Sequence, residues 1–203
     1  MYIPSFNKFD NIDEVVSFMQ RYSFATIVTV KDGVPSATHL PFIVSRKDDK
    51  VILRSHFAKA NVQSADIIDS RPLVIFAEPH AYISPKNYEK EANVPTWNYL
   101  AVHAYGNCMI LASEEEKEAL LVETINYYEA EYLKQYDGLP DEYKQRMMKG
   151  IVAFEIVVDD LQAKKKLSQN RSETERENII ADLGKSKDQN ERDTGAYMSV
   201  KNK

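Results

Sequence analysis

A β-hairpin is predicted by residues 24–45, which read FATIVTVKDGVPSATHLPFIVS. The β-branched run at 24–30 favours a strand, and the Asp32-Gly33 pair that follows it is typical of a tight hairpin turn. The partner strand is expected over 36–45. Because a turn rather than a helix joins these strands, the stretch favours an antiparallel sheet over a doubly wound parallel one.

The rest of the chain predicts a small barrel. Further strands are expected at 51–54, 73–77, 99–111 and 151–158, and helices at 12–19, 58–69, 114–135, 140–149 and 173–183. Ser113 and Glu116 form a capping box at the start of a helix. Gly106 lies inside a strand, where it indicates a bulge or a close backbone approach. We therefore expect a mainly β chain with marginal helices (α+β), folded as an antiparallel split β-barrel.

One folded domain is expected over residues 1–184. The 203 residues are 43% hydrophobic, enough for a sizeable core. Residues 185–203 are polar and charged with almost no apolar side chains, so this sequence predicts a flexible C-terminal tail.

The composition favours a cytoplasmic protein that does not coat nucleic acid. Lys and Arg number 26 against 31 Asp and Glu, for a net charge of −5. The lone Cys108 excludes an intrachain disulfide, and no apolar run approaches the ~20 residues of a membrane helix. We also expect no signal peptide at the N-terminus.

A phosphate-binding loop is the first candidate site. The segment contains Arg54, Ser55, His56, Lys59 and Asn61, where a predicted strand ends and a predicted helix begins. Free N–H groups at a helix N-terminus, a lysine charge and small hydrogen-bonding side chains all suit a phosphate. The alternative is a solvated loop without a ligand, since such clusters are common on surfaces.

A second candidate set is Ser36, Thr38 and His39. Pro35 and Pro41 flank them and place this strand at an edge or interrupt its pairing, because proline has no N–H to donate. The freed backbone groups and these side chains would suit the polar edge of a planar ring. Alternatively, His39 is an ordinary histidine of the barrel.

Polar and aromatic side chains around the irregular segment 78–96 form a third set, which comprises His80, Trp97, Asn98 and His103. Trp97 suits a cover over a flat ligand, a subunit contact or a core position. The four histidines lack metal-ligand spacing, and no serine or cysteine stands in a nucleophile motif. We therefore expect neither a metal site nor a catalytic nucleophile.

The last candidate is a basic run, Lys164-Lys165-Lys166, followed by the polar residues Ser168, Gln169, Asn170 and Arg171. These residues suit an ordered loop that closes over a site. A DNA-contacting patch and a solvated face are the alternatives, and no helix-turn-helix pattern accompanies the run.

Five of these segments carry a family resemblance. They are 35–41 (PSATHLP), 56–61 (HFAKAN), 79–85 (PHAYISP), 94–99 (VPTWNY) and 166–171 (KLSQNR). In them the chain resembles the PaiB family of FMN-binding negative transcriptional regulators, which belongs with the split β-barrel flavoproteins. The sequence departs from that family's pattern at Glu78, Asn87 and Lys165, where the family usually has Gly, Trp and Trp.

The resemblance implies an FMN cofactor bound at the interface of a homodimer. By that reading the phosphate is held by His56, Lys59 and Asn61, and the isoalloxazine lies along Ser36, Thr38 and His39. Trp97 and Asn98 lie near the dimer contact, and Ser168, Gln169 and Arg171 close the site. The implied role is repression of protease-synthesis and sporulation genes, through direct or indirect contact with DNA.

Two other functions stay open at this point. The chain would be an FMN-dependent oxidoreductase if electrons pass between FMN and a nicotinamide or small substrate, with His39 as the best proton donor. Alternatively, the barrel binds haem through one of its four histidines, or binds a ligand without any cofactor.

Overall fold

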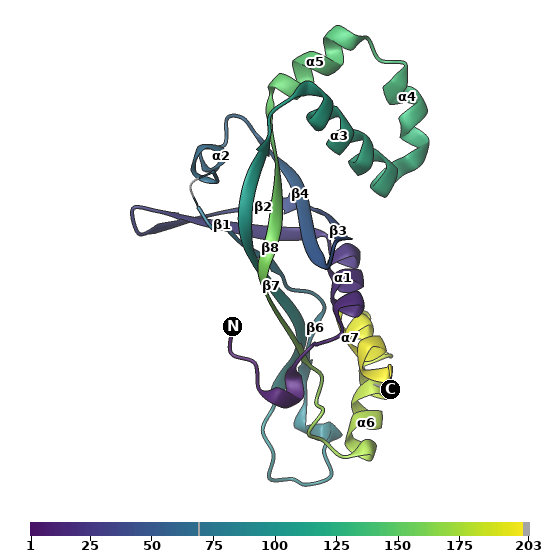
Figure 1. The fold of residues 1–203 in the computed structure, drawn as a ribbon. Coiled ribbons are helices and arrows are strands. Elements are labelled where there is room, and N and C mark those ends of the chain that lie inside the picture. The colour runs from purple at the N-terminus through teal and green to yellow at the C-terminus, as the bar shows by residue number, and fades with distance from the viewer. Residues whose placement is uncertain (69, 201–203) are drawn as a thin grey trace. The chain divides into compact units, whose positions relative to one another are not determined.

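The computed structural model describes residues 1–68 and 70–200, which form two compact units (Figure 1). Unit 1 comprises Met1–Val15, Ala77–Val102 and the chain from Gln162 onward, and unit 2 comprises Val16–Phe76 and His103–Leu161. Strands β7 (Thr96–Leu111) and β8 (Ile151–Lys166) contribute residues to both units. Within the described residues, no helix is long and apolar enough to cross a membrane.

Unit 2 contains an open antiparallel sheet. Its strands lie in the order β2-β1-β5-β7-β8-β4-β3, and the new ones are β1 (Phe24–Lys31), β2 (Val34–Pro41), β3 (Ile43–Lys47), β4 (Lys50–Ala58) and β5 (Leu73–Phe76). β1 pairs antiparallel with β2 and β5, and β4 pairs antiparallel with β3 and β8. This arrangement confirms the antiparallel split-barrel prediction.

The predicted hairpin is confirmed, but its second strand is shorter than expected. Asp32 and Gly33 have φ angles of 51° and 78°, as a two-residue hairpin turn requires. The expected strand at 36–45 is interrupted at Phe42, whose buried ring and backbone bond to Ser23 (N···O 2.8 Å) bend the chain between β2 and β3. These two strands therefore lie at opposite ends of the strand order although one residue separates them, and the sheet must roll up.

Packed phenylalanine rings fill the interior of unit 2. Phe42 contacts Phe76 and Phe154 at centroid distances of 6.0 and 6.2 Å, and Phe57 contacts Phe154 at 5.2 Å. All four rings are fully buried. Such buried aromatic pairs contribute area burial plus roughly 0.5–1.5 kcal/mol each from their geometry.

The close approach expected at Gly106 is confirmed. A Cβ at this position would lie 2.2 Å from the carbonyl oxygen of Val157, so only glycine allows β7 to approach β8 this closely.

The helices of unit 2 agree only in part with the sequence. α3 (Glu114–Glu129) begins with the predicted capping box and α5 (Asp141–Lys149) matches the expected helix, while α3 ends at 129 and a short turn leads to α4 (Leu133–Asp137). Figure 1 shows these three helices grouped together. The helix expected at 58–69 is wrong: β4 continues to Ala58, and α2 (Gln63–Asp66) has a single turn.

Unit 1 contains a hairpin and two helices. β6 (His80–Ile83) lies in the segment expected to be irregular and pairs with the start of β7, from Ile83 opposite Thr96 to His80 opposite Tyr99. Short 3-10 turns occur at Ser5–Asn7 and Pro85–Asn87, and α6 (Glu173–Leu183) confirms the predicted last helix. α1 (Ile12–Arg21) crosses the boundary between the units.

The flexible tail expected over 185–203 is wrong for its described part. α7 (Gln189–Ser199) packs against α6 and β6, as Figure 1 shows for α6. Met198 and Thr194 are buried. A Cβ atom added at Gly195 would lie only 3.2 Å from the Cβ of Leu183. The glycine lets the two helices approach, so a few small or apolar contacts order a segment that looks polar.

Candidate functional site

A hydrogen-bond network in unit 2 joins two residues expected at the site, Thr38 and Asn61, with their neighbour Gln63. The amide of Asn61 donates to Thr38 Oγ1 at 3.0 Å, and this hydroxyl donates to Gln63 Oε1 at 2.6 Å. The backbone N–H of Gln63 donates to Asn61 Oδ1 at 3.0 Å. The loop after β4 is therefore tied to edge strand β2 through side chains, which holds Thr38 and Asn61 in one orientation.

Gln63 is the residue that the sequence reasoning missed. Its side chain is buried and donates to the oxygens of Ser36 and Ile27 and to Thr29 Oγ1, at 3.1, 3.3 and 3.1 Å. Burying an amide is favourable only when its groups are paired, and here every partner belongs to β1 or β2. The one local signal is Asn61, which two residues earlier is typical of an Asx turn.

The expected phosphate-binding residues on and after strand β4 differ in whether their polar groups already have partners within the protein. Arg54 is committed, since its guanidinium forms ion pairs with Glu155 at 2.7 Å and Glu123 at 3.0 Å. Ser55 is buried and donates to the carbonyl of Pro41 at 2.7 Å. His56 is half-buried and Lys59 is exposed. Of this cluster, His56, Lys59 and Asn61 keep groups that a ligand can reach.

The charges of these groups differ. Burial lowers the pKa of His56, so its imidazole is neutral near pH 7 and offers a hydrogen bond rather than a charge. Lys59 has no carboxylate partner in the part of the chain that the structure describes. Because α2 has one turn and begins at Gln63, the helix dipole expected to assist a phosphate is not present there. Lys59 supplies the cationic charge of this cluster.

His39 lies apart from Thr38 because successive side chains of a strand point to opposite faces. Ser36 and Thr38 are half-buried, whereas His39 is exposed and stacks on Phe24 at a centroid distance of 6.2 Å and an interplanar angle of 27°. Phe24 is itself 68% exposed. This pair forms a flat, accessible aromatic surface at the sheet edge.

An exposed aromatic group occupies the β6–β7 hairpin of unit 1. Trp97 is 51% exposed and contacts His80 and Tyr82 edge-on, at centroid distances of 5.4 and 6.2 Å. The core position considered for Trp97 is therefore wrong, and its ring is accessible to a ligand or a partner chain.

Asn98 and Gln169 are engaged within unit 1. Asn98 is fully buried, donates to the sulfur of Met198 at 3.3 Å and accepts from Ser168 Oγ at 3.1 Å. Gln169 accepts from the N–H of Leu167 at 2.8 Å and donates to the carbonyl of Lys165. Both side chains therefore bond to neighbours within unit 1, and their expected contact with a cofactor stays a prediction.

A cationic cavity of about 400 Å³ lies beside this loop. Among its lining residues are Lys164, Lys166, Ser168 and Arg171. Arg171 donates to Asn93 at 2.8 Å and its guanidinium lies 3.8 Å above the Tyr88 ring. The loop thus borders this cavity, and two lysines of the basic run, Lys164 and Lys166, are among the lining residues.

The three departures from the family pattern each have a local environment. Asn87 is buried and donates to Asp182 at 3.2 Å. Lys165 pairs with Glu14 at 3.4 Å and lies 4.8 Å from the Phe9 centroid. Glu78 is exposed and precedes a cis proline. Asn87 and Lys165 are therefore integrated in unit 1 by polar contacts where an indole would pack.

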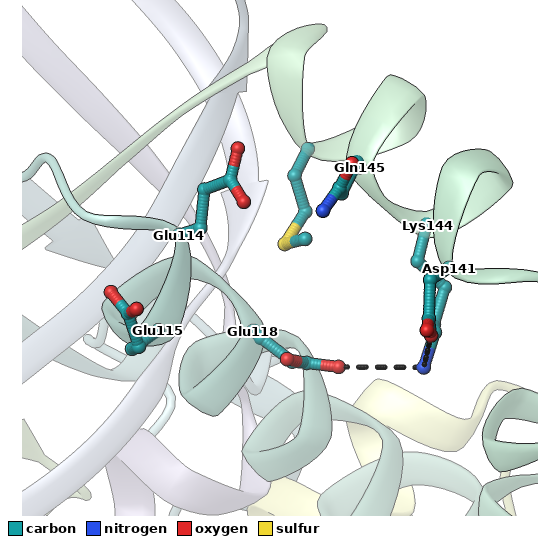
Figure 2. A pocket seen from close by; sticks show the side chains of 7 residues that line it. Glu114, Glu115, Glu118, Asp141, Lys144 and Gln145 are labelled. Carbon is teal, nitrogen blue, oxygen red and sulfur yellow. Dashed lines mark ion pairs between the residues drawn. The ribbon is translucent and has the colours of Figure 1, made fainter.

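An acidic pocket of about 310 Å³ lies between α3 and α5. Figure 2 shows Lys144 between two of its carboxylates, Glu118 at 3.7 Å and Asp141 at 3.2 Å. The hydrogen bond that Lys144 donates to Asp141 raises the pKa of Lys144, so its ammonium group stays charged. No cluster with metal-ligand geometry exists among the described residues.

Comparison with known proteins points to one family. The family model described as "Putative FMN-binding domain" matches residues 1–160. The chain is 41% identical over 203 residues to the Protease synthase and sporulation protein PAI 2 of Bacillus subtilis, covering 99% of this chain and 98% of that one.

Solved structures agree with the fold. The FAD and heme binding protein from Mycobacterium smegmatis matches with a TM-score of 0.56 at 14% identity, covering 76% of this chain and 70% of that one. The flavocytochrome Anf3 from Azotobacter vinelandii also gives 0.56 at 14% identity, covering 79% and 69%. At these identities the likeness concerns the split-barrel architecture alone.

Proposed function

This chain belongs to the FMN-binding domain family and has FMN as its cofactor, and from that premise we propose that it is a negative regulator of transcription. Its targets are genes for protease synthesis and sporulation. The observation that carries this proposal is the 41% identity to the PAI 2 protein over nearly the full length of both chains.

The unit 2 cluster fits FMN chemically. Lys59 provides a charge and His56 and Asn61 provide hydrogen bonds for the phosphate, while Ser36 and Thr38 offer polar groups to the ring system. The exposed pair of Phe24 and His39 suits the flat isoalloxazine face. FMN would supply one- and two-electron redox chemistry, and these side chains would bind and orient it.

A homodimer is part of the proposal. A drug-sized ligand is usually buried over most of its surface, and the exposed rings of Phe24 and Trp97 offer apolar area for a second copy. We propose that regulation is indirect, because the chain carries a net charge of −5 and no helix-turn-helix pattern accompanies its basic run. We expect two flavins per dimer in light scattering combined with flavin absorbance.

The cofactor site is tested by Lys59→Met with Lys50→Met as its matched control. Lys50 is an exposed lysine at the start of β4, and Lys59 directly follows the end of that strand. Losing a charge-assisted hydrogen bond of about 1.5–3 kcal/mol would weaken FMN binding roughly tenfold to a hundredfold in Lys59→Met only. Equal affinities of the two variants, measured by flavin fluorescence quenching, would remove Lys59 from the site.

The regulatory role is tested in a strain lacking this gene, with a reporter driven by an extracellular-protease promoter. Wild type and Lys50→Met should repress the reporter, and Lys59→Met should repress it less. If wild type leaves expression unchanged, the regulator proposal is wrong. If Lys59→Met loses FMN yet represses fully, the cofactor has no part in regulation.

A further inference from the structure

Gln63 fixes the direction of the hydrogen bonds in the network that joins β1, β2 and the loop after β4. Its side-chain nitrogen lies 3.3 Å from the carbonyl oxygen of Ile27, 3.1 Å from that of Ser36 and 3.1 Å from Thr29 Oγ1. Backbone carbonyls only accept hydrogen bonds, so exchanging the amide nitrogen with its oxygen would set oxygen against oxygen twice. The side-chain oxygen of Gln63 must therefore face Thr38.

The hydroxyl of Thr38 is thereby fixed as an acceptor toward a ligand. Its oxygen lies 2.6 Å from Gln63 Oε1, and because a carbonyl oxygen has no hydrogen, the hydroxyl proton must point to Gln63. One lone pair of the hydroxyl accepts the amide of Asn61 at 3.0 Å. A hydroxyl has one proton and two lone pairs, so Thr38, which is only half-buried, keeps a single lone pair for a ligand.

Asn61 is fixed in the opposite sense, as a donor. Its oxygen accepts the backbone N–H of Gln63 at 3.0 Å, so its amide nitrogen faces Thr38. One N–H of this nitrogen bonds to Thr38, and no acceptor for the second N–H occurs among residues 1–68 and 70–200. Asn61 is half-buried like Thr38. A donor and an acceptor of fixed direction thus lie side by side.

Burial keeps this arrangement rigid. Gln63 is 2% exposed and Thr29 is 3% exposed, so water does not compete for their bonds. Strand β2 lies at one end of the strand order, and Gln63 holds it through the backbone of Ser36 and the side chain of Thr38. Since residues two apart in a strand point to the same face, the side chains of Ser36 and Thr38 keep a common orientation.

We propose that Gln63 is a positioning residue of the FMN site, which sets Thr38 to accept an N–H or O–H group of FMN and Asn61 to donate to a phosphate oxygen. This inference rests on the FMN site proposed above. A phosphate oxygen placed at Thr38 would meet a lone pair and be repelled, so the network also decides which part of FMN lies beside Asn61. Gln63 is buried and acts through these two neighbours.

The experiment measures FMN affinity by flavin fluorescence quenching in Gln63→Met, at a temperature where circular dichroism shows the variant to be folded. Methionine keeps the approximate length of the side chain and removes its amide. Leu120→Ala is the matched control, because this buried leucine of α3 packs with Ile43 and Ala153, and its truncation destabilises unit 2 without removing a bond of the network. Gln63→Asn, whose amide is one carbon shorter, is the second variant if Gln63→Met does not fold.

Gln63→Met should weaken FMN binding roughly fivefold to thirtyfold, as the loss of one or two oriented hydrogen bonds would, and Gln63→Asn should do the same. Leu120→Ala should change FMN affinity less than about twofold. Equal affinities of Gln63→Met and wild type would overturn the proposal. Equal weakening in Leu120→Ala would overturn it as well, because lost stability alone would then explain the effect.

A double-mutant cycle with Thr38→Val tests whether Gln63 acts through Thr38. The double variant should bind FMN at most about twofold more weakly than Gln63→Met alone, because both changes remove the same contact. Thr38→Ser keeps the hydroxyl and should stay within about threefold of wild type. If the two single effects multiply in the double variant, Gln63 acts independently of Thr38 and the proposal is wrong.

Lys59→Met in the same titrations separates this inference from the site on which it rests. If Lys59→Met and Gln63→Met both bind FMN like wild type, the proposed site is wrong and the positioning role is wrong with it. If Lys59→Met binds FMN more weakly while Gln63→Met does not, the site stands and only the positioning role is wrong. Weaker binding in both variants supports both proposals.

Discussion

Gln63→Ala should lower stability by about 3 kcal/mol, which is large for one polar substitution. The side chain accepts one hydrogen bond from Thr38 and donates to partners on β1 and β2. An amide has two N–H groups, so its donor bonds amount to about two at full strength, shared among Ile27, Thr29 and Ser36. Three bonds at about 1 kcal/mol each give the stated loss.

The assay is urea unfolding followed by far-UV circular dichroism, with Gln145→Ala as control. Gln145 is exposed on α5, so its truncation should change the free energy of unfolding by less than about 0.5 kcal/mol. For a chain of this length, the Gln63→Ala loss corresponds to a fall in Tm of about 6–12 °C. A loss below about 1 kcal/mol would refute the view that Gln63 holds β1, β2 and the Asn61 loop together.

Three further predictions concern other parts of unit 2. Gly106→Ala should cost about 1–3 kcal/mol or more in chemical unfolding, because its methyl group would meet the Val157 carbonyl at 2.2 Å, whereas Gly138→Ala, whose nearest atom is at 3.5 Å, should be nearly neutral. Burial lowers the pKa of His56, so the unfolded state binds the proton more readily; stability should fall as pH drops below about 6.5, and His56→Gln should flatten that dependence in Tm measured from pH 7.5 to 5. Partial burial raises the pKa of Cys108 to about 12, so Ellman's reagent at pH 8 should label the native protein far more slowly than the urea-unfolded one, and equal rates would contradict the partial burial of this thiol.

Local patterns predicted the elements that depend on neighbouring residues. The Asp32-Gly33 turn, the Ser113 capping box and the close approach at Gly106 follow from backbone conformations or short-range bonds that few residue types allow. The prediction of a helix at 58–69 is wrong because polar side chains of this segment form hydrogen bonds with strands β1 and β2. Gln63 is the clearest case, since the partners of its side chain lie 25 to 36 positions away in sequence.

By itself, the sequence determined the antiparallel hairpin, the split-barrel class and membership of an FMN-binding family, because these rest on turn chemistry, alternating patterns and ordered motifs. Only the tertiary structure decided which polar side chains are available. Arg54 and Asn98 look like ligand-binding residues in the sequence, but in the structure Arg54 forms ion pairs and Asn98 forms hydrogen bonds with other residues of the protein. Lys166 lines a cavity whereas the adjacent Lys165 contacts Phe9, because successive side chains of a strand point to opposite faces. Which of the two lysines faces the cavity depends on long-range packing, and the two identical residues by themselves do not indicate it.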